Sequence, residues 1–337
     1  MKALVCAAPG RLAVEERPEP VVAPGEALVR VRRVGICGTD YHIYEGNQPF
    51  LDYPRVMGHE LAVEVVANDT GHGPRPGEIC IVNPYLSCGE CRACRRGKPN
   101  CCVKLAVLGV HRDGGMTEFL SLPPENLIAS EGLSVDECAM VEFLAIGAHA
   151  VRRAGLSADD RAVVVGAGPI GLGVALFAKL SGASVTVVDR AAGRLDAARR
   201  LCDPALVVLA DDSIGSKLQD LTHGEGYDAV FDATGSRRAI EQGFDYVAQG
   251  GRYVLVSVVQ GEVTFSDAAF HRKELALLGS RNATAEDFAS VVRTMRGGQI
   301  DSSAWLTHRT TLSHAAGDLP TWARDRSNVV KAMIEVA

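Results

Sequence analysis

Long hydrophobic runs and clusters of basic residues are both missing from this sequence of 337 residues. The longest apolar stretch, 170–180, is interrupted by Lys179 and is too short to span a bilayer. The opening segment, MKALVCAAPGRLAVEERPEP, turns charged before the apolar core of a signal peptide could form. These absences argue against a membrane protein and a secreted one, and they favour a cytoplasmic location.

The charge balance argues against nucleic acid as the main partner. The formal net charge is −6, and no basic run interrupts the sequence. A hydrophobic content of 47% and a charged content of 23% are typical of a soluble globular protein. The length suits two domains rather than one core. We therefore expect a two-domain protein that acts on small molecules.

The pattern of expected secondary structure changes about halfway along the sequence. The first third contains short alternating runs, such as EALVRVRRVGI and LAVEVVA, separated by turn residues, and this pattern predicts a β-rich domain. From Arg161 onward, short β-branched strands alternate with glycine turns and amphipathic helices, which predicts a doubly wound parallel sheet of α/β class. A helix at 285–298 and a closing strand at 329–337 follow.

Four cysteines stand close together in the polar segment CGECRACRRGKPNCC. Cys88, Cys91, Cys94 and Cys102 follow one another at gaps of three, three and eight residues. This spacing predicts a closed zinc site of four sulfur ligands, which leaves no position for substrate and is therefore structural. Disulfides are the alternative, but ten cysteines without a secretory segment favour a reducing compartment. Cys101 is the spare thiol.

A glycine turn indicates a dinucleotide site. Gly166, Gly168 and Gly171 stand between the strand RAVVV and a helix that opens with Pro169 and Ile170. Such a turn lets backbone N–H groups approach a pyrophosphate. Asp189 ends the next strand, where a carboxylate can bind both ribose hydroxyls and repel the 2′-phosphate of NADP. NAD is the expected cofactor, although the positive charge of the adjacent Arg190 reduces the repulsion that the 2′-phosphate of NADP would meet.

Cys37, in GICGTDYH, and His59, in MGHE, each stand beside a glycine turn. Loops of this kind present ligands at a cleft, but a spacing of 22 residues does not by itself specify a metal site. Together with VEFLAIGAHA, the cysteine lobe and GAGPIG, these segments resemble the zinc-dependent medium-chain dehydrogenase/reductase family. The resemblance runs nearly end to end and is to the branch of sorbitol, threonine and sugar-acid dehydrogenases.

The resemblance implies a GroES-like catalytic domain, 1–146 with 285–337, and an inserted Rossmann NAD-binding domain, 147–284, with the active site between them. It implies two zinc ions per chain and a homo-oligomer, dimeric or tetrameric. Cys37 and His59 become ligands of the catalytic zinc, Glu60 an adjacent, exchangeable ligand, and Glu142 the third ligand. Phe143 follows Glu142 where that branch usually has proline, so Glu142 binds zinc directly or through a water.

The resemblance also implies a route for the proton. Thr39 and His42 match the relay that carries it through the cofactor ribose to solvent. A turn cap and a surface histidine are the alternatives for these two residues. Lys331 matches a basic position near the cofactor phosphates, with a solvated lysine at the edge of a strand as the alternative.

Glutamate as the third ligand favours a polyhydroxylated substrate, because extra hydroxyls need partners once they are desolvated. In the basic segment 270–284, some side chains are expected to bind a carboxylate, or else form a solvated charge cluster: His271, Arg272, Lys273, Arg281 and Asn282. The prediction is a sugar-acid dehydrogenase that oxidises a secondary alcohol of an aldonate such as a hexonate. A polyol, vicinal-diol or threonine dehydrogenase is the alternative. An inactive homologue that binds NAD and zinc in a regulatory or structural role is the alternative of another class.

Overall fold

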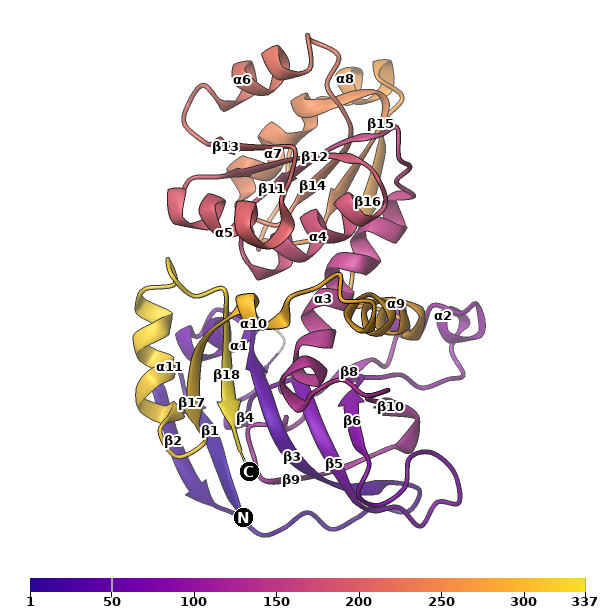
Figure 1. Ribbon diagram of the computed structural model, residues 1–337, viewed down its shortest axis with the longest axis vertical. Coiled ribbons are helices and arrows are strands. Elements are labelled where there is room, and N and C mark those ends of the chain that lie inside the picture. The colour runs from indigo at the N-terminus through magenta and orange to yellow at the C-terminus, as the bar shows by residue number, and fades with distance from the viewer. Residues whose placement is uncertain (50, 337) are drawn as a thin grey trace. The chain divides into compact units, whose positions relative to one another are not determined.

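The chain folds into two compact units, which we describe separately. The structure, a computed structural model, describes residues 1–49 and 51–336. One unit consists of Met1–Phe143 and Thr284–Ala337, and the other of Leu144–Ala283 (Figure 1). The first predicted domain boundary, after residue 146, and the first unit boundary, after Phe143, both fall inside helix α3, Val135–Ala154.

The first unit is built mainly from strands, as predicted. Its largest sheet has seven strands in the order β10-β6-β5-β3-β18-β17, with β9 paired to β3, and two smaller sheets have the orders β2-β1-β4 and β7-β8. The strands are β1 Lys2–Ala8, β2 Arg11–Glu16, β3 Ala27–Ile36, β4 Arg55–Val56, β5 Glu60–Ala67, β6 Ile79–Val82, β7 Tyr85–Leu86, β8 Ala106–Val107, β9 Phe119–Leu122, β10 Leu127–Ala129, β17 Leu306–Thr311 and β18 Lys331–Glu335. Its helices are α1 Gly38–Glu45, α2 Arg92–Arg95, α9 Ala285–Arg296, α10 Ser302–Trp305 and α11 Ala315–Arg324, with 3₁₀ turns η1 Pro99–Cys101 and η2 Pro124–Asn126.

Strand β3 shows why this sheet forms and how the C-terminal tail completes it. Val29 and Val31 are fully buried, and each buried valine contributes about 1.5–3 kcal/mol of hydrophobic stabilisation. The closing strand β18, yellow in Figure 1, pairs antiparallel with β3 and sets Ala332 opposite Ile36. The pairing therefore brings Lys331 next to the segment that follows β3.

The second unit confirms the predicted doubly wound parallel sheet. Its six strands have the order β13-β12-β11-β14-β15-β16, and every neighbouring pair is parallel. This order corresponds to the 3-2-1-4-5-6 arrangement of dinucleotide-binding domains, in which ligands bind at the carboxyl edge of the strands. The elements are β11 Arg161–Val165, α4 Pro169–Leu180, β12 Ser184–Asp189, α5 Ala192–Cys202, β13 Leu206–Leu209, α6 Ile214–Leu221, β14 Tyr227–Asp232, α7 Arg237–Tyr246, β15 Val247–Leu255, α8 Asp267–Arg272 and β16 Ala276–Gly279.

Helix α3 contributes residues to both units. Its 20 residues include acidic side chains in the first turn, Asp136 and Glu137, and basic side chains in the last turn, Arg152 and Arg153. These charges oppose the helix dipole at both ends and favour the helix. Over residues 1–49 and 51–336, we find no helix whose length and apolar character would let it cross a membrane.

Candidate functional site

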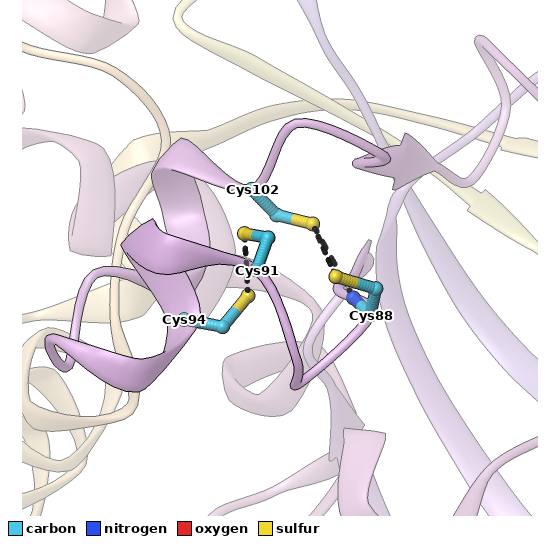
Figure 2. A group of neighbouring side chains, drawn as sticks. All are labelled: Cys88, Cys91, Cys94 and Cys102. Atoms are coloured by element: carbon cyan, nitrogen blue, oxygen red, sulfur yellow. Dashed lines mark hydrogen bonds between the residues drawn. The ribbon is translucent and has the colours of Figure 1, made fainter.

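Four cysteine sulfurs come together in the segment after β7. Cys91 is the N-cap of α2 and Cys94 lies within it, so a single helical turn brings both sulfurs to the same side. The Sγ atoms of Cys88 and Cys102 lie 3.4 Å apart, and those of Cys91 and Cys94 lie 3.5 Å apart (Figure 2). All four lie within 4.8 Å of one another. This arrangement fits a tetrahedral zinc ion that has no open position.

The chemistry of these thiols also suits a cation. Backbone N–H groups lower the pKa of Cys91 to about 6, whereas burial and neighbouring sulfurs raise the pKa of Cys94 to about 11. The sulfurs thus share protons, which a zinc ion would replace. Their separations exceed the length of a disulfide, about 2.05 Å. Cys101 is exposed and lies outside the cluster.

A second group of metal-binding side chains lies where β3 ends and β5 begins. Cys37 is the N-cap of α1, Glu60 starts β5 and His59 directly precedes it, with donor atoms of all three within 4.8 Å of one another. The buried Asp40 connects the two segments, because its carboxylate accepts hydrogen bonds from the N–H of Cys37 at 2.9 Å and the N–H of Gly58 at 3.1 Å. One side chain therefore fixes the spacing of the two loops.

The donor set of this second group suits zinc. A thiol, an imidazole and a carboxylate are all zinc ligands. Nδ1 of His59 is buried and has no hydrogen-bond partner among the described residues. Burial lowers the pKa of His59, but Cys37 and other acidic neighbours raise it well above its ordinary value. The imidazole thus stands in a negative environment that a cation would neutralise.

Glu142 lies on α3 and is buried, but its carboxylate is outside the group of Cys37, His59 and Glu60 that the described residues form. The hydroxyl of Tyr85 donates a hydrogen bond to Oε1 of Glu142. Burial raises the pKa of Glu142 to about 7, against the opposing effect of His59. The partner of this carboxylate among the described residues is therefore Tyr85, and its role as a zinc ligand stays a prediction.

Lys331 is buried and forms an ion pair in the first unit. Its side chain is 1% exposed, so the solvated alternative is wrong, and its ammonium group lies 2.8 and 2.7 Å from the two carboxylate oxygens of Glu60. The carbonyl of Ile36 accepts a further hydrogen bond from it at 3.3 Å. The ammonium group therefore binds Glu60 and the backbone beside Cys37, and its role near the cofactor phosphates stays a prediction.

Thr39 and His42 both lie on α1, one helical turn apart. Thr39 is half-buried beside Cys37. The His42 side chain is 55% exposed, and its Nδ1 lies 3.9 Å from Oε2 of Glu45. The helix thus begins beside Cys37 and leaves the imidazole of His42 in solvent.

The glycine turn lies at the carboxyl edge of the parallel sheet, between β11 and α4. Gly168 is the N-cap of α4, and Pro169 opens the helix, followed by Ile170. A Cβ on Gly171 would lie 1.7 Å from the carbonyl oxygen of Gly166, so only glycine allows this close packing. A Cβ on Gly168 would meet nothing within 4 Å, which leaves space in front of the helix N-terminus. This geometry suits a pyrophosphate.

Asp189 ends β12 at the same edge. Its carboxylate is buried and accepts hydrogen bonds from the N–H of Ala167 at 2.7 Å and the N–H of Ala191 at 2.8 Å. Arg190 is exposed. The guanidinium of Arg194 lies 3.7 Å from Oδ2 of Asp189. Asp189 therefore orders the glycine turn as well as standing where a ribose would bind.

The basic residues of the segment 270–284 separate into two groups. Arg272 ends α8 and precedes β16, whereas Arg281 follows β16 at the carboxyl edge of the sheet. Strand β16 thus holds them at opposite edges. The ammonium of Lys273 donates hydrogen bonds to three backbone carbonyls, including that of Val247 at 2.8 Å. Of the three, only Arg281 shares an edge with the glycine turn.

Three residues of these sites were not singled out in the sequence analysis. Asp40 has a local signal, because the spacing Cys-x-x-Asp at a helix start allows a capping box. Arg194 stands five residues after Asp189, in the first turns of α5. Tyr85 has no local signal, since 57 residues separate it from Glu142.

Family descriptions match both parts of the chain. Residues 23–132 match "Alcohol dehydrogenase GroES-like domain" and residues 169–296 match "Zinc-binding dehydrogenase". The chain belongs to the zinc-dependent medium-chain dehydrogenase/reductase family. It is therefore an oxidoreductase of the zinc-type dehydrogenases, with the GroES-like and Rossmann folds that the sequence predicted.

The similarity to individual members of the family extends over nearly the whole chain. L-galactonate-5-dehydrogenase of Escherichia coli K12 is 42% identical over 97% of this chain and 96% of its own. Sorbitol dehydrogenase of Halalkalibacterium halodurans is 30% identical, with 93% of each chain covered. A crystal structure described as a short chain alcohol dehydrogenase (rspB) from E. coli CFT073, complexed with NADH, has a TM-score of 0.93, 30% identity and 99% coverage of each chain.

Proposed function

We propose that this dehydrogenase transfers a hydride from a secondary alcohol of a sugar acid, such as a hexonate, to NAD. The observation that carries the proposal is the pair of sites in one chain: a thiol, imidazole and carboxylate group in the first unit, and a glycine turn with an acidic strand end in the second. The likeness to a relative named L-galactonate-5-dehydrogenase, at 42% identity, supports the substrate class.

In this proposal Cys37, His59 and Glu142 hold the catalytic zinc, with Glu60 beside it, and the four-cysteine lobe holds a second zinc. Bound zinc supplies Lewis-acid chemistry that acidifies the substrate hydroxyl. The hydroxyl of Thr39 would take up the substrate hydroxyl proton as it gives up its own, and the exposed His42 would release a proton to water at the end of this relay. Gly166, Gly168, Gly171 and the opening of α4 would hold NAD, which would supply the hydride acceptor.

Asp189 is expected to select NAD. A buried carboxylate that stands at the ribose can bind both hydroxyls, whereas a 2′-phosphate would meet like charge there. Replacing Asp189 with Ala should weaken NAD binding by about 10- to 100-fold, the effect of a lost charged hydrogen bond, and should raise the relative use of NADP. Binding is measured by fluorescence titration with each cofactor.

Asp189→Asn is the matched control, because the amide oxygen can still accept one of the hydrogen bonds from the N–H groups of Ala167 and Ala191. The exclusion of NADP should weaken in this variant too, but the glycine turn should be better preserved than in Asp189→Ala. Equal catalytic efficiency with NAD and NADP in the unaltered protein would contradict the role of Asp189.

We assign recognition of the substrate carboxylate to Arg281. It follows β16 at the carboxyl edge, where ligands of open α/β sheets bind. Arg272 precedes the same strand, and the ammonium group of Lys273 is already bound to backbone carbonyls. Neither therefore serves this role.

The test is a comparison of kcat/KM for hexonates with that for the corresponding neutral polyols. A charged hydrogen bond of about 1.5–3 kcal/mol predicts a preference for the acid of about one to two orders of magnitude. Arg281→Gln should erase this preference without harming polyol turnover, and added salt should reduce it. Arg272→Gln is the control and should keep the preference.

Two results would change the assignment. If sorbitol, xylitol, a vicinal diol or threonine is oxidised faster than every hexonate, the polyol or threonine alternative replaces the sugar-acid proposal. If no hydroxylated substrate yields NADH, the chain is an inactive member of its family.

A further inference from the structure

A cavity of about 550 Å³ lies within the first unit, among residues that neither candidate site uses. Its walls come from the start of β1, the segment between β2 and β3, strand β4, and strand β9 with the residues that precede it. Small-molecule sites in proteins commonly have volumes of about 300–1,000 Å³. None of the lining residues is a candidate zinc ligand or belongs to the glycine turn. The cavity therefore has the size of a further ligand site.

Positive charge exceeds negative charge in the side chains that line this cavity. Three arginines contribute to the lining, Arg17, Arg55 and Arg112, against two carboxylates, Glu26 and Asp113. Two of the arginines share one carboxylate, because the guanidinium groups of Arg17 and Arg55 each lie 3.3 Å from an oxygen of Asp113. The lining is thus basic, although the formal net charge of the whole chain is −6.

Arg55 has more hydrogen-bond donors than it has partners. Its side chain is 15% exposed, and its Nε is buried without a hydrogen-bond partner among the described residues. Nη1 lies 3.3 Å from Oδ1 of Asp113, and Nη2 lies 3.4 Å from the carbonyl oxygen of Asp52. Charged hydrogen bonds of this kind are usually about 2.7–2.9 Å long. Because buried polar groups in proteins are nearly always hydrogen-bonded, a further acceptor is expected beside Arg55.

The guanidinium group of Arg112 forms no ion pair within residues 1–49 and 51–336. The backbone holds this residue in place, since its carbonyl oxygen accepts a hydrogen bond from the N–H of Gly109 at 2.8 Å and the residue forms a β-bridge with Leu108. Arg112 itself is half-buried. Its side chain can therefore bind an anion without first losing another charged partner.

Apolar side chains form the rest of the lining. Val56 on β4 and Leu120 on β9 are buried, and Phe119 on β9 is half-buried. Val21 also lines the cavity and is 92% exposed, in a segment whose backbone Pro20 restrains. A ligand with an apolar body would remove this valine from water, which favours binding.

We propose that this cavity binds a small organic anion, a carboxylate or a phosphate monoester that carries an apolar body. Arg55 and Arg112 bind the anionic group, because a planar guanidinium presents paired donors that match the oxygens of carboxylates and phosphates. Phe119 and Val21 contact the apolar body. Neither zinc nor NAD takes part, so this proposal does not depend on the function proposed above.

The experiment measures binding of benzoate and of phenyl phosphate to the zinc-loaded protein by isothermal titration calorimetry. NADH is kept at saturation, so that the glycine turn is not available to a phosphate group. Benzamide, a neutral analogue of benzoate, tests the need for charge. The variants are Arg55→Gln and Arg112→Gln, and the matched control is Arg11→Gln, which alters an exposed arginine on β2. Arg281→Gln tests whether the candidate substrate site contributes.

At least one of the two anions should bind at one molecule per chain, and the tighter of them identifies the anionic group. Arg55→Gln and Arg112→Gln should each weaken this binding by about 10- to 100-fold, the effect of a lost charged hydrogen bond. Arg11→Gln and Arg281→Gln should leave it unchanged, and benzamide should bind at least about 10-fold more weakly than benzoate. The bound anion should also raise the unfolding temperature of the unaltered protein more than that of Arg112→Gln.

Absence of saturable binding by both anions would overturn the proposal, as would equal affinities of Arg112→Gln and Arg11→Gln. Loss of binding in Arg281→Gln would assign the anions to the substrate site instead and would overturn it too. If Arg55→Gln does not fold, Arg112→Gln decides, because its guanidinium group has no ion pair to lose within the described part of the chain.

Discussion

Cys37→Ser should abolish turnover while the protein remains folded. The thiol follows β3 as the N-cap of α1 and is one of three donor groups that meet there. Loss of Lewis-acid assistance costs several kcal/mol of transition-state stabilisation, which corresponds to a fall in kcat of about a thousandfold or more. Metal analysis should show a decrease from two zinc ions per chain to one.

Cys101→Ser is the control for this prediction. Cys101 is exposed and lies outside the cysteine cluster, so its variant should keep both metal ions and full turnover. Normal activity of Cys37→Ser, or an unchanged zinc content, would show that Cys37 is not a ligand of the catalytic zinc.

Cys88→Ser should instead damage folding. Its sulfur lies 3.4 Å from that of Cys102 and completes the four-sulfur cluster. Structural zinc contributes about 10–16 kcal/mol in small zinc domains, so loss of one ligand should lower the unfolding temperature and the yield of soluble protein. Calorimetry with metal analysis measures both effects.

A matching experiment uses a chelator. Mild treatment should remove the catalytic zinc and activity first, because that site keeps an open position, and the lobe zinc only later. If Cys88→Ser keeps its zinc and its unfolding temperature, the lobe is not a structural metal site.

The features that the sequence predicted well are local in the chain. The four cysteines lie in one short segment of the chain, and the glycine turn lies between strand β11 and the helix that follows it, α4. Spacing alone defines such groups. The strands of the parallel sheet were predictable for a related reason, since they contain buried β-branched residues in sequence, such as Val163 and Val164 on β11.

The surroundings of the candidate catalytic metal depend on contacts that no local pattern encodes. Lys331 and Glu60 are 271 residues apart and meet only because β18 pairs with β3. For the same reason the residue after β3, Cys37, comes to lie beside the C-terminal tail. The sequence did not reveal the pairing of Lys331 with Glu60, which strand register produces.

Residues of the basic segment that are close in the sequence are not close in space. Arg272 and Arg281 are close in the sequence, yet β16 lies between them and each strand residue adds about 3.3 Å. They therefore stand at opposite edges of the sheet, and only one edge binds ligands in this fold. The direction of β16 decides which of the two arginines lies at the ligand-binding edge. The composition of the segment does not reveal that direction.

The most direct test of the account measures NADH formation from NAD and a panel of hexonates and polyols, before and after removal of the catalytic zinc and after its return. We predict rapid oxidation of at least one hexonate, loss of activity when the metal is removed, and recovery when zinc is added. Undiminished turnover without the metal, or no NADH from any hexonate or polyol with both zinc ions bound, would contradict it.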